Sequence, residues 1–189
     1  MKKYLLATAF AATLLTPLTN AADYIIDHKG AHASVNFKIK HLGYSWLTGR
    51  FDNFNGKFSY DAANVSASKL NITIDTSSIN SNHAERDKHL RSDDFLDVNE
   101  FSKAKFVSSS ISGTDEKLLV KGMFTFHGVS KEITIDAEKI GEGQDPWGGY
   151  RAGFSGTTRI ALKDFGIKTN LGPASTHVEL SFHIEGVKI

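Results

Sequence analysis

The 189-residue chain carries 22 lysine and arginine residues against 21 aspartate and glutamate residues. This balance argues against a nucleic-acid-binding protein, which would present a basic face to the phosphates. Because cysteine is absent, the chain can form neither a disulfide nor a lipoprotein anchor, and a metal site would have to use histidine and carboxylate ligands alone.

The first 22 residues have the organisation of a secretory signal peptide. Lys2 and Lys3 are followed by an uncharged run over 4–18, and the small residues Ala21 and Ala22 indicate a cleavage site. The run is shorter than the roughly 20 residues of a membrane-spanning helix, and no later stretch is a stop-transfer segment. We therefore predict a signal peptide over 1–22 and one exported domain over 23–189, without an integral membrane segment.

Alternation of apolar and polar residues dominates the remaining chain. In KLNITIDT (69–76), Leu70, Ile72 and Ile74 fall on one face of a strand and the polar residues on the other. Similar stretches, separated mostly by short turns, predict about eight antiparallel strands at 33–40, 50–60, 69–76, 104–112, 118–128, 131–138, 149–162 and 177–186.

Eight such strands can stack as a sandwich or close into an up-and-down barrel. The apolar faces of 118–128 and 149–162 mix phenylalanines with Gly122 and Gly156, a pattern that favours a barrel with room inside. A slip in the alternation at 52–53 indicates a β-bulge, which helps a sheet to curl. We expect an all-β fold, an antiparallel up-and-down barrel with a long, narrow, apolar lumen.

The alternation stops between the third and fourth predicted strands, over 77–101 (SSINSNHAERDKHLRSDDFLDVNEF). We predict one short helix over 83–90 in this insert, with Asn82 as the N-cap and Glu85 completing a capping box.

The charges of the insert indicate a solvated helix held by ion pairs. Asp87 precedes Arg91 by four positions and Glu85 precedes His89 by four, which is the favourable spacing for pairing on a helix. His83 and His89 are six positions apart and fall on different helix faces, so the insert does not predict a metal site.

An acid/base site in the insert is a weaker hypothesis. His89 with Asp93 and Asp94 could exchange protons with a substrate. The stretch GFSG around Ser155 resembles a nucleophile elbow only superficially, because Ser155 is expected in the middle of a strand. No glycine-rich phosphate loop is present.

Several stretches together resemble the YceI family. They are HLGYSWLTGRFDNFNGKF (41–58), NSNHAERDKHLRSDDFLDVNEF (80–101), FHGVSKEI (126–133) and ALKDFGI (161–167). The central motif, Arg86-Asp87-x-His89-Leu90, is the most specific of them, and the resemblance covers essentially all of 23–189. Ser102 and Leu96 depart from the family pattern, which often has proline and a second aromatic residue there.

The resemblance implies an extended lipocalin-like barrel that holds a polyisoprenoid, such as a quinone tail or a prenyl phosphate, in a hydrophobic tunnel. It also implies a protein that is exported or periplasmic in bacteria and is not known as a catalyst. We therefore expect periplasmic carriage, storage or sequestration of a polyisoprenoid lipid, with no catalytic residue, metal or other cofactor. No protein partner or oligomeric state is predicted.

Strand parity predicts the residues that line the tunnel. They are Phe37, Ile39, Leu70, Ile72, Ile74, Phe124, Phe126, Ile133, Ile135, Phe154, Ile160, Leu180 and Phe182. Candidates for the headgroup or the tunnel mouth are Arg86, Asp87, His89 and Arg91. Two alternatives stay open: a hydrolase or isomerase acting on an isoprenoid or small ester through His89 and insert carboxylates, and a structural or interaction protein with a filled barrel.

Overall fold

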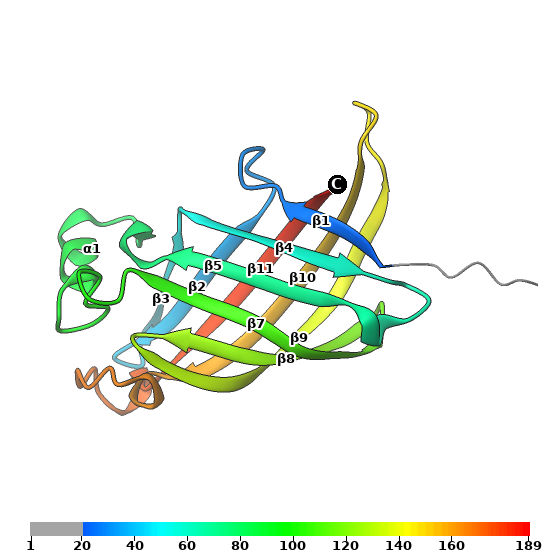
Figure 1. Cartoon of the computed structure of the whole chain (residues 1–189). Helices are drawn as coiled ribbons and strands as arrows, with labels where there is room; N and C mark the ends of the chain where they lie inside the picture. Colours follow the sequence, from blue (N-terminus) through cyan, green and yellow to red (C-terminus); the bar gives the residue numbers. More distant parts are fainter. Residues whose placement is uncertain (1–20) are drawn as a thin grey trace, which may run out of the picture.

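The computed structural model describes residues 21–189, which form an antiparallel β-barrel with one short α-helix (Figure 1). The predicted signal peptide lies outside the described residues except for Ala21 and Ala22, and Ala22 is the first residue of the first strand. Within 21–189, no helix is long and apolar enough to cross a membrane.

The strands are β1 (Ala22–Ile26), β2 (Ser34–His41), β3 (Ser45–Phe51), β4 (Phe54–Tyr60), β5 (Lys69–Asp75), β6 (Ile79–Asn80), β7 (Lys103–Thr114), β8 (Lys117–Phe126), β9 (Val129–Gln144), β10 (Tyr150–Ala161) and β11 (His177–Lys188). The helix α1 (Ala84–Arg91) lies in the insert between β6 and β7, and the 3-10 helices η3 (Leu162–Phe165) and η4 (Pro173–Ser175) lie between β10 and β11.

These segments occupy eight positions around a closed barrel. β1 and β2 both pair with β11 and share one position. β3 and β4 share the next, and β5 and β6 share the third. The barrel closes because β1 pairs with both β4 and β11, so the predicted up-and-down barrel is confirmed and the sandwich is excluded.

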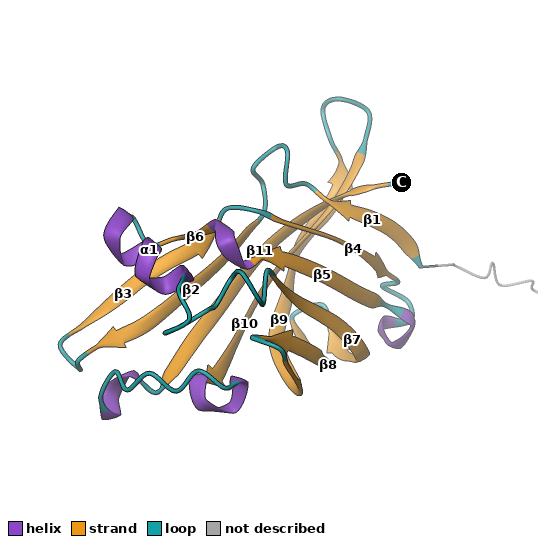
Figure 2. Ribbon diagram, turned by 60° about the vertical axis from the view of Figure 1, so that its left-hand side comes forward, coloured by secondary structure: helices purple, strands orange, loops and turns teal. Residues whose placement is uncertain are grey.

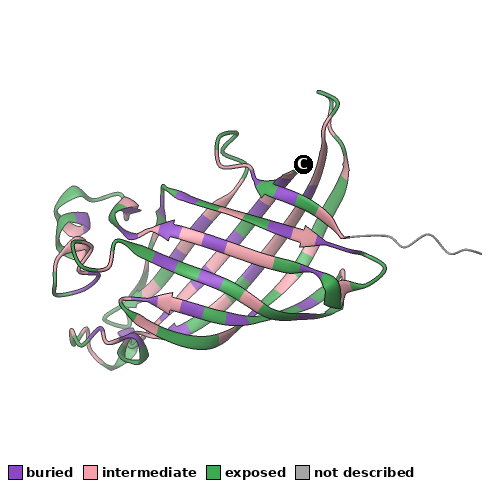
Figure 3. Ribbon diagram, in the orientation of Figure 1, coloured by how far each residue is buried: buried purple, intermediate pink, exposed green. Residues whose placement is uncertain are grey.

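The alternation in the sequence corresponds to alternating burial along the strands, which Figure 3 shows as bands of buried and exposed residues. The slip in the alternation at 52–53 is a two-residue break between β3 and β4, where the partner changes from β2 to β1, and not a β-bulge within one strand. The strand at 22–26 and the start of β3 at 45–49 were missed. Both are short, and in β3 the apolar Trp46 and Leu47 are adjacent, so neither gave a clear alternation.

The two glycines that indicated an open lumen do not create its space. A Cβ atom on Gly122 would lie 2.6 Å from the ring of Phe106, and one on Gly156 would lie 2.9 Å from Ile135. Large side chains from neighbouring strands therefore fill the volume above these glycines. These glycines therefore do not explain the space inside the barrel, and the large cavity lies in another part of the lumen.

Candidate ligand-binding cavity

One end of the barrel encloses a cavity of about 490 Å³, which is within the usual range for small-molecule sites. We call this the wide end; it carries α1, the β2–β3 hairpin (41–45) and the segment 162–176 (Figure 1). Figure 2 brings it forward, with α1 and the short 3-10 helices around the open side. The polar residues of the lining come from the surrounding segments or the strand end beside them: Lys40, His41, Arg86, His89, Asn170 and Ser175.

The interior of the cavity is apolar. Branched and aromatic side chains from β2, β3, β5, β8, β10 and β11 form its walls. The lining side chains of these walls carry no nitrogen or oxygen, so the interior offers no side-chain partner to a polar ligand. The cavity is chemically suited to a hydrocarbon chain.

The structure divides the predicted lining residues between two hollows. Phe37, Ile39, Ile74, Phe124, Phe126, Ile160 and Leu180 line the wide-end cavity. Leu70, Ile72, Ile135, Phe154 and Phe182 line a second hollow of only about 80 Å³. Ile133 packs against the core but lines neither hollow. Whether any of them touches a ligand stays a prediction.

Strand parity missed the residues that close the wide end. They come from the insert and from the segment after Leu162, where no alternation exists: Leu90, Phe95, Leu96, Ile167 and Leu171. Phe95 and Leu96 are 9% and 6% exposed despite following two aspartates. An apolar pair inside a charged insert was the available signal, because such a pair needs a buried surface to pack against.

The opposite end of the barrel, which we call the narrow end, is filled by aromatic rings. Phe58 stacks on Tyr24 with ring centroids 4.8 Å apart, and Phe154 packs edge-on against Phe58 and Tyr60 at 5.4 and 5.0 Å. Such edge-on and offset contacts add stabilisation beyond burial alone. Little space remains for a ligand at this end.

A polar cluster covers these rings. Tyr60 donates a hydrogen bond to the carboxylate of Asp115, and Lys139 lies 3.0 Å from Asp115 and 3.1 Å from Glu142. Burial raises the pKa of Tyr60, and its hydrogen bond to Asp115 raises it further, so the phenol stays neutral. Burial opposes the charge of Lys139, but the two carboxylates outweigh it and raise its pKa. The narrow end is thereby closed by satisfied polar groups.

The helix at the wide end is anchored to β6 through side chains that were expected in solvent. His83, not Asn82, is the N-cap and accepts from the Arg86 N–H, while Asn82 has a φ of 62°. Arg86 donates to the hydroxyl and carbonyl oxygens of Ser81 at 2.7 and 2.6 Å. Arg91 donates to the carbonyl oxygens of Ser77 and Ile79 at 2.7 and 2.9 Å, so the predicted Asp87–Arg91 and Glu85–His89 ion pairs are wrong.

Asp87 is 7% exposed and accepts hydrogen bonds from the backbone N–H and the hydroxyl of Ser81. Burial alone would raise the pKa of this carboxyl, but the Ser81 hydrogen bonds and the charges of Arg91 and Arg86 outweigh it, and its pKa lies below the usual range. The Arg86-Asp87 part of the central motif therefore ties the insert to the barrel.

Of the four mouth candidates, Arg86 and His89 line the cavity. Asp87 and Arg91 do not line it; Asp87 accepts from Ser81, just after β6, and Arg91 donates to Ile79 in β6. The His89 Nε2 atom lies 2.9 Å from Asp94 Oδ2, and its ring packs edge-on against Phe95 at 4.9 Å. His89 and Asp94 are 58% and 66% exposed, so this pair is open to solvent at the mouth.

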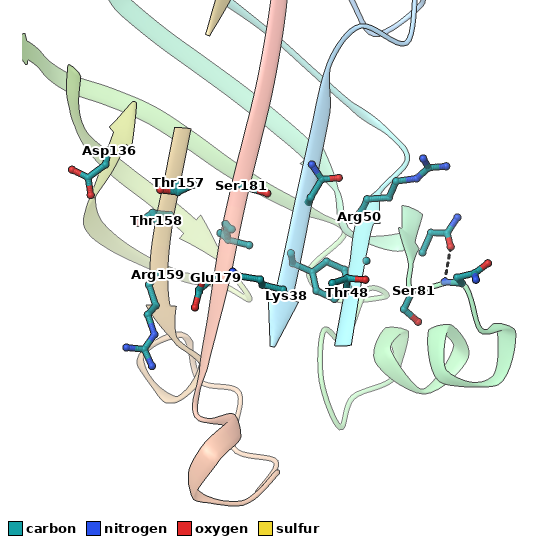
Figure 4. Close-up of a pocket in the computed structure, with 16 residues that line it drawn as sticks. Lys38, Thr48, Arg50, Ser81, Asp136, Thr157, Thr158, Arg159, Glu179 and Ser181 are labelled. Carbon is teal, nitrogen blue, oxygen red and sulfur yellow. Dashed lines mark hydrogen bonds and ion pairs between the residues drawn. The ribbon is translucent and has the colours of Figure 1, made fainter. Parts of the chain in front are cut away.

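A larger hollow, of about 760 Å³, lies on the outside of the barrel (Figure 4). Its labelled side chains come from β2, β3, β9, β10 and β11, with Ser81 from the segment after β6, and all are charged or hydroxylated. Lys38 forms an ion pair with Glu179 at 3.0 Å across its floor. This outer groove is open and polar, and therefore unsuited to a hydrocarbon chain.

A cluster of possible metal ligands lies at the bend between β1 and β2, where ligand atoms of Asp27, His32 and Glu185 lie within 4.8 Å of one another. The Arg151 guanidinium lies 2.6 Å from both carboxylates and 2.8 Å from Asp145. Its hydrogen bond lowers the pKa of Asp27 to about 2. Since the Arg151 guanidinium already engages both carboxylates of the cluster, the cluster is an ion-paired brace of β1, β10 and β11.

Comparison with known proteins identifies sequences and structures that are similar to this chain. Residues 24–186 match the YceI-like domain. A UPF0312 protein of Shewanella baltica (strain OS185) is 56% identical over 190 residues that cover all of both chains. The crystal structure of a Campylobacter jejuni YCEI protein is 32% identical, covers 80% of this chain and 91% of its own, and superposes with a TM-score of 0.72.

A polyisoprenoid binding domain from Saccharophagus degradans, implicated in plant cell wall breakdown, has the same fold with a TM-score of 0.66. It is 18% identical, and the match covers 90% of this chain and all of that domain. The family match and the relative at 56% identity each extend over nearly the whole barrel and the insert. The chain therefore belongs to the YceI family.

Proposed function

We propose that the protein binds a long polyisoprenoid lipid, of the quinone or prenyl-phosphate type, with its tail in the wide-end cavity. The proposal rests above all on one observation: the cavity is apolar throughout its interior and has its polar residues around the mouth. Family membership and the polyisoprenoid-binding neighbour support lipid binding in general. The predicted signal peptide supports carriage, storage or sequestration in the periplasm.

The energetics of tail burial favour long, apolar ligands. Burying about ten methylene-sized groups contributes about 8 kcal/mol, comparable to the cost of association. Affinity is then expected to rise with tail length until the aromatic rings of the narrow end stop the chain. Arg86 and His89 are the residues placed to meet a headgroup, since both line the cavity near the charged exterior.

The direct test is extraction of protein purified without detergent, followed by mass spectrometry of the organic phase, together with titration of a long polyprenol and of geraniol. We expect a co-purified prenyl lipid, or tighter binding of the polyprenol than of geraniol. Protein that carries no prenyl lipid and binds neither compound would refute the proposal.

A hydrolase or isomerase is the second candidate, favoured by the contact between His89 and Asp94 at the mouth. Within 21–189, no serine or threonine hydroxyl is hydrogen-bonded to His89, so a nucleophile would have to come from water or substrate. A purely structural role with a filled barrel is less favoured, because only the narrow end is filled by side chains.

A further inference from the structure

The β2–β3 hairpin exposes three large apolar side chains at the wide end. Leu42, Tyr44 and Trp46 are 57%, 88% and 48% exposed. The turn is held by positive φ angles of 51° at Leu42 and 86° at Gly43, so the tip projects as a tight, defined structure. Three such residues within five positions form a local apolar patch rather than isolated exposed residues.

This patch is continuous with the rim of the cavity. Lys40, His41 and Leu42 line the cavity, while Tyr44 and Trp46 do not. The Ser175 hydroxyl donates to the Lys40 carbonyl at 2.5 Å and fixes the hairpin to the segment after β10. A surface that covers the hairpin tip therefore also lies against the cavity mouth.

Lysines surround the aromatic part of the patch. The ammonium groups of Lys38 and Lys40 lie 4.7 and 5.7 Å from the centroid of the Trp46 ring. Tryptophan and tyrosine favour the boundary between hydrocarbon and headgroups, and lysines are attracted to anionic lipid headgroups. Glu179 pairs with Lys38 and offsets part of this charge, which leaves Lys40 as the main cationic group at the tip.

The other side of the mouth has a different character. There α1 is followed by the acidic pair Asp93 and Asp94, both exposed, with Asp94 in contact with His89. Over 83–101 the insert carries six carboxylates against three lysine and arginine side chains, so its net charge is negative. An anionic surface would be repelled from this side and attracted to the hairpin, so the charge distribution orients the molecule as well as attracting it.

We propose that the tip of the β2–β3 hairpin docks on a lipid bilayer that contains anionic headgroups, with Tyr44 and Trp46 at the interface and the cavity mouth beside it. The proposal builds on the proposed lipid-binding function: docking allows a polyisoprenoid tail to pass between bilayer and cavity without crossing water, where exposing apolar carbons is costly.

The β9–β10 hairpin provides an internal comparison. It projects from the barrel away from the wide end (Figure 1) and exposes Trp147, at 78%. The Arg151 guanidinium lies 5.6 Å from the Trp147 ring, but its charge is already balanced by Asp27, Asp145 and Glu185. Exposed aromatic surface is thus present here without net positive charge or a cavity mouth.

Because Trp46 and Trp147 are the only tryptophans of the chain, each can report on its own hairpin. The Trp147→Phe variant retains Trp46, and Trp46→Phe retains Trp147. Both are mixed with phosphatidylcholine vesicles, with and without phosphatidylglycerol, and with vesicles whose acyl chains carry bromine. We expect the Trp46 emission to shift to shorter wavelength and to be quenched by bromine with anionic vesicles, while Trp147 emission is unchanged. Docking is refuted by unquenched Trp46, or by equal quenching of both.

Substitutions outside the cavity lining test the two parts of the patch. Lys38→Ala leaves the Glu179 carboxylate unpaired, so the local charge falls by one unit. Partitioning into anionic vesicles should therefore fall about five-fold, the effect of one lysine near an anionic surface. Tyr44→Ser should weaken partitioning into all vesicles, and raising the salt concentration should weaken only the charge-dependent part. Unchanged partitioning of both variants would refute the assignment of the patch.

Titration of a polyprenol without vesicles separates this proposal from the function on which it rests. The Tyr44→Ser variant should bind the polyprenol with the affinity of the parent protein but partition less into vesicles. A parent protein that binds vesicles but takes up no polyprenol refutes the proposed function alone. A parent protein that binds polyprenol and stays off vesicles refutes the docking alone.

Discussion

The two ends of the barrel are built from the same alternation of apolar and polar residues, yet one end is filled and the other is hollow. At the narrow end, rings from β1, β4 and β10 meet one another across the lumen, with Tyr24, Phe58 and Phe154 in direct contact. At the wide end, the apolar residues of the strands face a cavity of about 490 Å³ instead. Burial of alternate residues therefore does not decide whether a barrel has space inside.

The two ends differ in the segments that supply the residues closing them. The narrow end is closed mainly by strand residues and by Asp115 at the β7–β8 turn, which Tyr60 and Lys139 contact. The wide end is bordered by two long connections, the insert and the segment 162–176, which lie around the opening (Figure 2). Residues of both connections line the cavity. Space for a ligand thus depends on how the connections are anchored.

The largest contrast is expected from removing a side chain at each end. Phe58→Ala should lower the free energy of unfolding by about 4 kcal/mol, because it deletes a ring from a filled core. Ile39→Ala should lower it by about 1 kcal/mol, since Ile39 is half-buried and borders a cavity. Equilibrium urea denaturation measures both values. Equal losses would contradict the distinction between a filled and a hollow end.

The next largest effect is expected from changing Asp87, the buried carboxylate that holds α1 to the barrel. Asp87→Asn should lower the free energy of unfolding by about 2 kcal/mol at pH 7, because buried hydrogen bonds to a charged group are lost. Since the pKa of Asp87 is lowered by folding, its stabilisation is present above the ordinary carboxyl pKa of about 3.9 and is lost as the pH falls towards its folded value. The difference between the two proteins should therefore shrink below about pH 4.

Denaturation at a series of pH values measures this difference. Asp115→Asn is the matched change at the narrow end, where the pKa of Asp115 is likewise lowered, first by the hydrogen bond from Tyr60. Its side chain is 45% exposed, so the loss should be smaller. A gap between wild type and Asp87→Asn that does not change with pH would contradict the role given to the carboxylate.

Filling the cavity should weaken ligand binding. Ala104 is 2% exposed and lines the cavity, so Ala104→Phe should place a ring where the tail lies. Displacing about two methylene-sized groups corresponds to about a tenfold loss of affinity for a polyprenol, measured by titration. Thr48→Phe, in the outer groove, is the control and should bind normally. If only the control variant, Thr48→Phe, bound the polyprenol more weakly, the ligand site would lie on the outside of the barrel.

The smallest effect is expected at His89. Its ring is 58% exposed and pairs with an exposed carboxylate, so His89→Ala should change the free energy of unfolding by less than about 0.5 kcal/mol. A polyprenol carries only a hydroxyl headgroup and most of its binding energy comes from the tail, so the binding hypothesis predicts that its affinity changes by less than about threefold. Turnover of a prenyl ester by the wild type that disappears in this variant would instead favour the enzyme hypothesis.

Local patterns in the sequence were enough to predict most of the strands, the interruption at 52–53 and a helix close to its observed bounds of 84–91. These features depend on neighbouring residues, because alternation and capping act over a few positions. The same patterns placed most of the candidate residues on the lumen side, for example Ile74 and Phe124. They could not assign a residue such as Ile72 to the narrow hollow rather than to the cavity.

The tertiary structure alone decided the rest. Asp87 appears as one charge among many in the insert, and only its position beside Ser81 makes it a buried anchor. Barrel closure depends on β1 pairing with β11 across more than 150 positions of chain, which no local pattern encodes. Alternation along the chain is enough to predict which residues avoid water. Which of these residues pack against one another, and which line the wide-end cavity, depends on contacts between distant parts of the chain, and these exist only in the folded barrel.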